Sequence, residues 1–472
     1  MNEQVHEVAA SSRELAGRGR RRASMDPLLR WRYYPRLFQW LFFAATVVLA
    51  YFAFAPGQRG EGNLATEVVW RLWWPLLPFV LLVGGRIWCG VCPFGGVSDA
   101  AASLRKSQKA APASFRRIAP WLGVISVFGF GMAFLALGLE ADSGATGTIL
   151  IGMVALSFLL ALFYRGRTFC RYLCPVGFIT RAYSYFSWLR PHGSREKTGI
   201  MAVCPVGQSP ASLRQPSQCQ MCGVCTRGPE ARGITTGFTA GSPRLPGTKE
   251  FGRPEAVLSL LMLGLMAADS VRMTQVFARY QHMALPYLGY NYRLTVAVGV
   301  TGLVGIILLL QLASAWFVSR SDRLPAISGE HAVDNAGSGS FSGSAFNSIG
   351  FSYLPLTMGV FMALALQHLW SGALPSLQTV LVESRLIDWA GHMPPTNVYF
   401  ISIPLKIMQV VLLGTGLYFS LTLSRKNLAA AGSAGESRPG RLSGGAIRRS
   451  AMVLTAFTGF GFLFLLPMSG AC

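Results

Sequence analysis

Eight cysteines follow a repeated spacing that suits metal–sulfur chemistry. The first pair lies in RIWCGVCPFG at residues 86–95, and the second in RTFCRYLCPVG at residues 167–177. Both segments read Arg-x-aromatic-Cys and then Cys-Pro-x-Gly. The second half recurs as CPVG at residues 204–207, and residues 219–225 form a C-x2-C-x2-C run, CQMCGVC.

This pattern favours an iron–sulfur cluster. A cubane needs four converging thiolates, and C-x2-C-x2-C is the run found in bacterial ferredoxins. Proline after cysteine removes an N–H donor and fixes φ, and glycine lets the backbone approach closely. Eight cysteines make two sets of four, so the sequence predicts two [4Fe-4S] clusters. The predicted ligands are Cys89, Cys92, Cys170 and Cys174 for one cluster, and Cys204, Cys219, Cys222 and Cys225 for the other.

Two alternatives stay open for these cysteines. In two-cluster ferredoxins the cysteine before proline binds the other cluster, so Cys174 and Cys204 could exchange places. A structural zinc site with four thiolate ligands also uses C-x2-C pairs. The two Cys-Pro pairs and the triple run favour iron–sulfur over zinc. Cys472 stands alone at the C-terminus and is interpreted as incidental.

The elements that must position these cysteines are transmembrane helices. Hydrophobic residues make up 51% of the 472-residue chain and charged residues 13%, with a mean hydropathy of +0.41. This composition excludes disordered chains and ordinary soluble domains, and nine cysteines are too few for a disulfide scaffold. A span needs about 20 apolar residues. The sequence predicts an all-α integral membrane protein with a cytoplasmic ferredoxin-like iron–sulfur segment and nine spans, at 37–55, 68–85, 118–138, 147–164, 255–271, 294–318, 351–371, 398–422 and 451–468.

The basic residues predict the orientation of these spans. Of the 42 Lys and Arg residues, 35 lie in the N-terminal tail and alternate loops and only 5 in the remaining loops. Basic loops stay in the cytoplasm. We therefore expect a multi-pass protein of the inner (cytoplasmic) membrane, in contact with lipid, with its N-terminus and its clusters on the cytoplasmic side. The net charge of +22 is then mainly a topology signal, and no nucleic-acid partner is expected.

Composition also divides the chain into segments. No cleavable signal peptide is expected, because the first apolar run is long enough to be an anchor. The predicted order is a basic cytoplasmic tail (1–36), a four-helix membrane unit with both Cys-Pro motifs (37–190), a cytoplasmic ferredoxin-like segment (191–253), two spans (254–326), a flexible linker (327–350), two more spans (351–427), a second linker (428–450) and a last span (451–472).

A cluster on one face cannot directly serve an acceptor on the other, because a 20-residue helix is about 30 Å long. Histidine with methionine is a haem or copper ligand set, and histidine with a carboxylate could bind and deprotonate a quinol. Ordinary packing is the alternative. Lys406 is expected eight residues into its span, facing the bundle interior or paired with Asp269. The candidates are Asp269, His282, Met283, His368, His392, Met393 and Lys406.

Three arginines flank the cysteines and also have two interpretations. Each could raise a cluster's reduction potential through its charge, or could anchor a helix end to lipid headgroups. The second role is the more frequent one for arginine at a helix end. The three are Arg86, Arg167 and Arg171.

Two helical hairpins, each followed by a Cys-Pro motif, and a ferredoxin-like run resemble the NapH/NosR/CcoG group of membrane polyferredoxins over about residues 37–230. The resemblance implies electron transfer through [4Fe-4S] clusters on the cytoplasmic side. Members of the group are quinol-linked electron donors or accessory proteins for periplasmic reductases and oxidases. This chain departs from the group in its Cys89–Cys92 spacing, in having no Cys-Pro after Cys225, and in its five C-terminal spans.

The expected function is electron transfer. The protein would pass single electrons between a cytoplasmic-side donor or the quinone pool and a partner redox complex, with quinol oxidation as the reaction it could catalyse. One alternative is a copper reductase or metalloenzyme assembly factor that uses the same clusters. The other is a transporter-like protein with a redox-sensing cluster.

Overall fold

Eight helices in the described part of the chain are long and apolar enough to cross a membrane. They coincide with the first eight predicted spans, and the all-α membrane fold is confirmed. The ninth, 451–468, lies outside the described residues apart from Met452. The computed structural model describes residues 25–55, 63–104, 109–193, 204–207, 213, 216–227, 234–238, 253–272, 274–321, 350–383, 402–432 and 452.

The first four spans come from the N-terminal half. They are α3 (Arg36–Phe54), the composite of α4 (Leu64–Thr66), η1 (Glu67–Trp73) and α5 (Trp74–Gly84), α8 (Ala113–Leu137) and α9 (Ser143–Phe163). The second span widens to a π-helix directly before two prolines, at positions 75 and 78. Proline lacks the N–H of the regular helical ladder, which accounts for an irregular span here.

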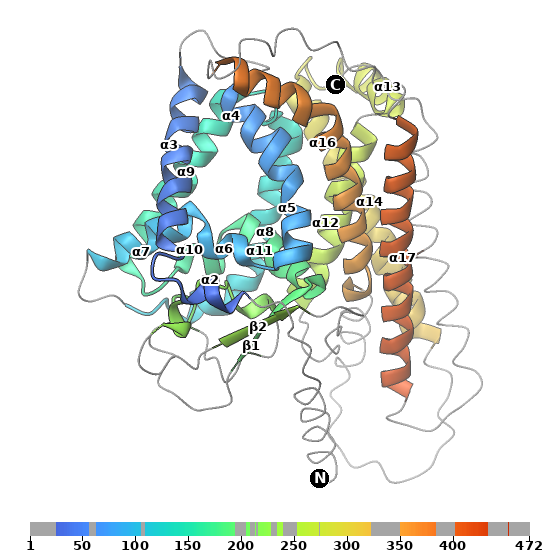
Figure 1. Cartoon of the computed structure of the whole chain (residues 1–472). Helices are drawn as coiled ribbons and strands as arrows, with labels where there is room; N and C mark the ends of the chain where they lie inside the picture. Colours follow the sequence, from blue (N-terminus) through green and yellow to red (C-terminus); the bar gives the residue numbers. More distant parts are fainter. Residues whose placement is uncertain are drawn as a thin grey trace, which may run out of the picture.

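The other four spans pack against the first four in one bundle. They are α12 (Arg253–Arg272), α14 (Tyr292–Ser321), α16 (Leu354–Glu383) and α17 (Ser402–Gly432). Helix α5 contacts α16, α8 contacts α12 and α14, and α16 contacts α17 (Figure 1). The apolar windows of α12 and α16 are 72% and 83% buried, against 11% for α3. These two helices are therefore the centre of the bundle, and both halves of the chain share one core.

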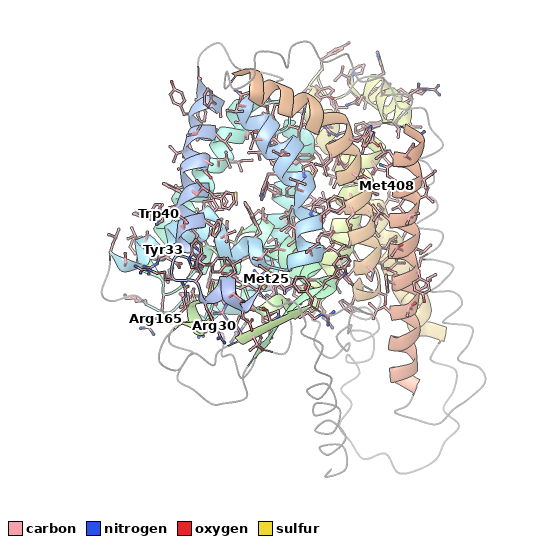
Figure 2. All side chains as sticks on the ribbon, in the orientation of Figure 1. Met25, Arg30, Tyr33, Trp40, Arg165 and Met408 are labelled. Carbon is pink, nitrogen blue, oxygen red and sulfur yellow. The ribbon has the colours of Figure 1, made fainter. Side chains whose placement is uncertain are left out.

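The outer helices present apolar side chains to the surroundings. Trp40 on α3 is 52% exposed and Met408 on α17 is 53% exposed, and both project away from the bundle (Figure 2). Lipid is the medium in which such a surface is stable, because exposed apolar area of this extent is unfavourable in water.

Short elements cluster at one end of the bundle, here called the cysteine side (Figure 1). They are α2 (Asp26–Arg30), α6 (Ile87–Val91), α7 (Pro93–Ser103), α10 (Thr168–Tyr172), α11 (Pro175–Tyr183), and the antiparallel pair β1 (Leu189–Gly193) and β2 (Ile234–Phe238). The antiparallel pairing of β1 with β2 was not predicted. Asp26 accepts hydrogen bonds from the N–H and hydroxyl of Thr236, both at 2.7 Å, so α2 is tied to β2.

The opposite end, here called the far side, carries α4 and the helix α13 (Gln275–Ala284) (Figure 1). Thr274 caps α13 by accepting a hydrogen bond from the Phe277 N–H. Phe277 is buried against the bundle, whereas Val276 and Met283 are about half exposed or more. Helix α13 is therefore amphipathic and lies beside the ends of α12 and α14.

Candidate iron–sulfur site

The two Cys-Pro motifs fold into the same local structure. Each begins with a five-residue helix, α6 or α10, that carries the first cysteine. Each continues into a longer helix, α7 or α11, whose N-cap is the second cysteine, Cys92 or Cys174. Proline occupies the first position of both longer helices, where its missing N–H removes no helical bond. The sequence repeat is thus also a structural repeat.

Backbone N–H groups point at the second cysteine of each motif. The Gly177 N–H donates to Cys174 Sγ at 3.3 Å. The N–H groups of Phe94 and Gly95 bond Cys92 in the same way. Both cysteines therefore sit at a helix N-terminus, where the dipole and the free N–H groups favour a thiolate.

The four cysteines of the motifs are electrostatic neighbours. Burial raises the pKa of the Cys92 thiol, and Cys170 and Cys89 raise it further. Burial also raises the pKa of Cys174, with further contributions from Cys170, Cys92 and Cys89. For Cys170 burial raises the pKa to about 12. The structure thus brings all four together as the first cysteine set, namely Cys89, Cys92, Cys170 and Cys174.

The remaining four cysteines line a common cavity at the cysteine side. Leu213 and Ile234 complete its apolar lining. Burial raises the pKa of the Cys225 thiol to about 12, with help from Cys222 and Cys204. We call this group the second cysteine set, with members Cys204, Cys219, Cys222 and Cys225. Among the described interactions, Cys174 groups with the first set and Cys204 with the second.

The C-x2-C-x2-C loop also directs N–H groups at its sulfurs. The Met221 N–H donates to Cys219 Sγ at 3.3 Å, and the Val224 N–H bonds Cys222. Met221 and Gly223 have φ values of 52° and 69°. A methionine with positive φ is strained, and such strain persists where the surrounding structure holds it. Here it turns the loop so that its N–H groups face inward.

The arrangement fits a [4Fe-4S] cluster in each set. Four cysteines come together in each set, and backbone N–H groups point at sulfurs of both. Hydrogen bonds to the sulfurs are among the features by which proteins set the reduction potential of such a cluster.

The two sets are joined by direct contact between their loops. A Cβ at Gly90, between Cys89 and Cys92, would lie 2.7 Å from the Gln220 carbonyl oxygen and 3.0 Å from that of Met221. Only glycine allows this approach. The Tyr34 hydroxyl donates to the Met221 carbonyl at 2.8 Å, so the C-x2-C-x2-C loop is also held by the segment just before α3.

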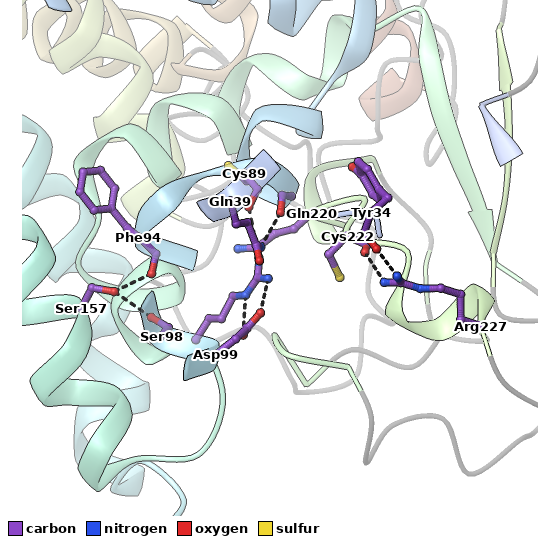
Figure 3. A network of polar contacts seen from close by, with 12 residues as sticks. Tyr34, Gln39, Cys89, Phe94, Ser98, Asp99, Ser157, Gln220, Cys222 and Arg227 are labelled. Atoms are coloured by element: carbon purple, nitrogen blue, oxygen red, sulfur yellow. Dashed lines mark hydrogen bonds and ion pairs between the residues drawn. The ribbon is translucent and has the colours of Figure 1, made fainter. Parts of the chain in front are cut away.

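A buried arginine lies where the loops meet. Arg167 donates to both carboxylate oxygens of Asp99, at 3.0 and 2.7 Å. It also donates to the Cys89 carbonyl at 3.3 Å and to Gln220 Oε1 at 3.0 Å (Figure 3). Its side chain is fully buried, so an anchoring role at lipid headgroups is excluded for Arg167. Asp99 and Gln220 were not predicted as site residues, because neither belongs to a motif with a recognisable spacing.

The far-side candidates do not form one site. Asp269 and His368 line a cavity that is partly open to the surroundings. Its other walls are mainly aromatic and aliphatic, and Ile179 of α11 reaches it from the cysteine side. His282 and Met283 are exposed on α13 and do not line it. His392 and Met393 lie outside the described residues.

Lys406 lies on α17, in the described part of the chain, and does not face the bundle interior. Its side chain is exposed on the outer surface of the bundle. Near a helix end a lysine can reach the interface with its amine, which explains why no buried partner is needed. Asp269 pairs instead with Arg272, at 3.4 Å.

Comparison with known proteins identifies the class. The family described as 4Fe-4S binding domain matches residues 66–110 and 146–192. These are the two structural repeats, each a span followed by a Cys-Pro motif, so this chain is a multi-pass membrane protein with a 4Fe-4S binding domain. The second cysteine set lies outside both matched segments.

The chain is also distantly related to a named protein. It is 26% identical over 197 residues to the protein NirI of Paracoccus denitrificans (strain Pd 1222). The alignment covers 37% of this chain and 29% of NirI, so the chain spans well under half of that relative. The relationship confirms the resemblance to NapH/NosR-type membrane polyferredoxins. No solved structure matches the chain.

Proposed function

We propose that this protein is a membrane-bound electron-transfer protein with two [4Fe-4S] clusters. The first cysteine set would hold one cluster and the second set the other. The observation that carries the proposal is the contact at Gly90 between two loops whose buried cysteines receive backbone N–H donors. When bound, a [4Fe-4S] cluster takes and gives one electron at a time.

The chain's own residues prepare both sites for this role. Cys174 is buried and the other cysteines are partly buried, and the N–H groups of Gly177 and Met221 compensate negative charge on sulfur. Thr180 Oγ1 lies 3.2 Å from Cys89 Sγ and offers a further hydroxyl contact. Hydrogen bonds to sulfur and low solvent exposure are the levers by which proteins set cluster potentials.

A quinol is the donor or acceptor class that the cavity best fits. Its walls are apolar and aromatic, with Asp269 and His368 as the polar groups. Small-molecule sites are lined mainly by apolar and aromatic side chains with a few polar groups, as this cavity is. Oxidation of one quinol to quinone releases two protons and two electrons. Asp269 and His368 would accept the protons, and Ile179, five residues after Cys174, marks the end of the cavity nearest the first cysteine set.

The partner at the other end of the pathway would be a redox protein complex. The distribution of basic residues supports an orientation in which the cysteine side faces the cytoplasm and the protein lies in a bacterial-type inner membrane. The cavity reaches the far side through Asp269, near the end of α12. Electrons would therefore pass between the quinone pool or a cytoplasmic donor and a partner that contacts the cysteine side.

Metal and sulfide analysis tests the proposal. The protein is purified anaerobically in detergent, and iron, zinc and acid-labile sulfide are measured with EPR of the dithionite-reduced sample. We expect about eight irons and a reduced cubane signal per chain. Zinc without sulfide would overturn the proposal and leave the cysteines as a structural clasp. About four irons would overturn the assignment of a second cluster.

A further inference from the structure

The Arg167 guanidinium lies between the two cysteine sets. Arg167 touches the first set through the Cys89 carbonyl and the second set through Gln220, the residue between Cys219 and Met221. Its backbone is tied to the second set as well, because the Arg167 N–H donates to the Pro205 carbonyl at 2.9 Å. Arg86 lies in the same region: its guanidinium is 4.0 Å from Cys89 Sγ and donates to the Ser217 carbonyl at 2.6 Å.

The contacts of Arg167 place its ion pair with Asp99 beside both sets. The Arg167 side chain is fully buried, whereas the Asp99 carboxylate is 41% exposed.

We propose that Arg167 sets the reduction potentials of both clusters together, with Asp99 and Gln220 holding its guanidinium between them. The inference rests on the proposed function, because it requires both clusters. Reduction adds one electron to a cluster, forms or breaks no bond, and adds one negative charge to this region. A buried guanidinium stabilises that charge, because solvent and salt screen it poorly there. The carboxylate of Asp99 opposes it, but is partly screened by water.

The two partners of the ion pair therefore have opposite effects. Arg167→Gln removes the positive charge, and both midpoint potentials should become more negative. Asp99→Asn leaves the guanidinium uncompensated, and both should become more positive. Arg167→Lys keeps the charge but not the bidentate geometry, so both midpoint potentials should stay close to those of the wild type. A role limited to structure would give Arg167→Gln and Asp99→Asn the same effect, since both break the same ion pair.

Arg227 provides a matched control. Its guanidinium donates to the Cys222 carbonyl at 3.3 Å and to the Gly223 carbonyl at 3.1 Å, both on the second loop. Arg227 is partly exposed and also bonds the Tyr34 carbonyl. Arg227→Gln should therefore make only the second cluster's potential more negative and change the difference between the two, whereas Arg167→Gln should leave that difference nearly unchanged.

The experiment is a dithionite titration of the full-length protein in detergent, followed by EPR. Iron and sulfide are measured first, so absence of clusters in the wild-type protein refutes the proposed function and is recognised before any variant is compared. With both clusters present, a shift of only one potential or of neither in Arg167→Gln overturns the inference. Equal signs for Arg167→Gln and Asp99→Asn, or a shift of both potentials in Arg227→Gln, also overturn it. If Arg167→Gln does not fold, the sign of the Asp99→Asn shift decides.

Discussion

Cys92 and Cys174 occupy equivalent positions in two copies of one structural unit. Each is the N-cap of a helix that starts with proline, and each accepts a backbone hydrogen bond from the glycine three residues later. The two copies face each other, so Cys174 lies near Cys92 although 82 positions separate them. A duplicated hairpin thus supplies two halves of one four-cysteine site.

Replacing cysteines by set should remove clusters one at a time. Cys170→Ser with Cys174→Ser is expected to lose about half of the iron and one EPR signal, because only one cluster's ligands are changed. Cys219→Ser with Cys222→Ser should remove the other signal. Cys472→Ser, in a residue outside both sets, is the control and should keep all the iron. Loss of both signals from the Cys174→Ser single variant would support shared ligands instead.

Gly90→Ala should separate the two loops. The added Cβ would meet two carbonyl oxygens at 2.7 and 3.0 Å, and overpacking of this kind typically costs about 1–3 kcal/mol. We expect a lower melting temperature and weaker magnetic coupling between the two reduced clusters. The measurements are a thermal unfolding assay and EPR.

Gly152→Ala is the matched control for that experiment. Gly152 is also helical, in α9, but a Cβ there would meet nothing within 4 Å. Alanine is favoured over glycine in a helix by up to about 1 kcal/mol, so this variant should be as stable as the wild type or more so. Equal behaviour of the two variants would contradict a tight contact at Gly90.

Asp269→Asn and His368→Gln should separate quinol chemistry from cluster chemistry. Both side chains line the cavity, and neither lies in the cysteine sets. We expect reduction of the clusters by a short-chain quinol to slow by about 10²-fold or more, the usual contribution of a general base. Reduction by dithionite should be unchanged. His282→Gln, on the exposed helix α13, is the control.

Ser157→Ala should weaken the contact between α7 and α9. Ser157 Oγ donates to the Phe94 carbonyl at 2.7 Å and lies 2.8 Å from Ser98 Oγ (Figure 3). Loss of the Ser157 hydroxyl removes both contacts, of which the one to Ser98 is buried, and should lower the free energy of unfolding by about 0.5–1.5 kcal/mol. Thr148→Ala, which removes only an exposed hydrogen bond to the Gly144 carbonyl four residues earlier, should change it much less.

Much of the fold follows from the sequence alone. A membrane helix satisfies its backbone hydrogen bonds within itself and needs a long run of apolar residues, and such a run can be recognised directly in the sequence. The spans from α3 to α17 were therefore predictable, as was the Cys-Pro repeat. That the Lys406 side chain is exposed was not predictable, because the face that a helix turns toward the bundle depends on its packing.

The candidate site, too, was predictable only in part. The sequence determined the two cysteine pairs that end in Cys-Pro-x-Gly, the further CPVG segment and the C-x2-C-x2-C run, because these local requirements are set by adjacent residues. Only the tertiary structure decided that Gly90 touches the Gln220 and Met221 carbonyls, and that Arg167 is buried against Asp99 rather than exposed to headgroups. Those partners lie 68 to 131 positions apart along the chain, and their contacts arise from helix packing, which leaves no periodic signal in the sequence.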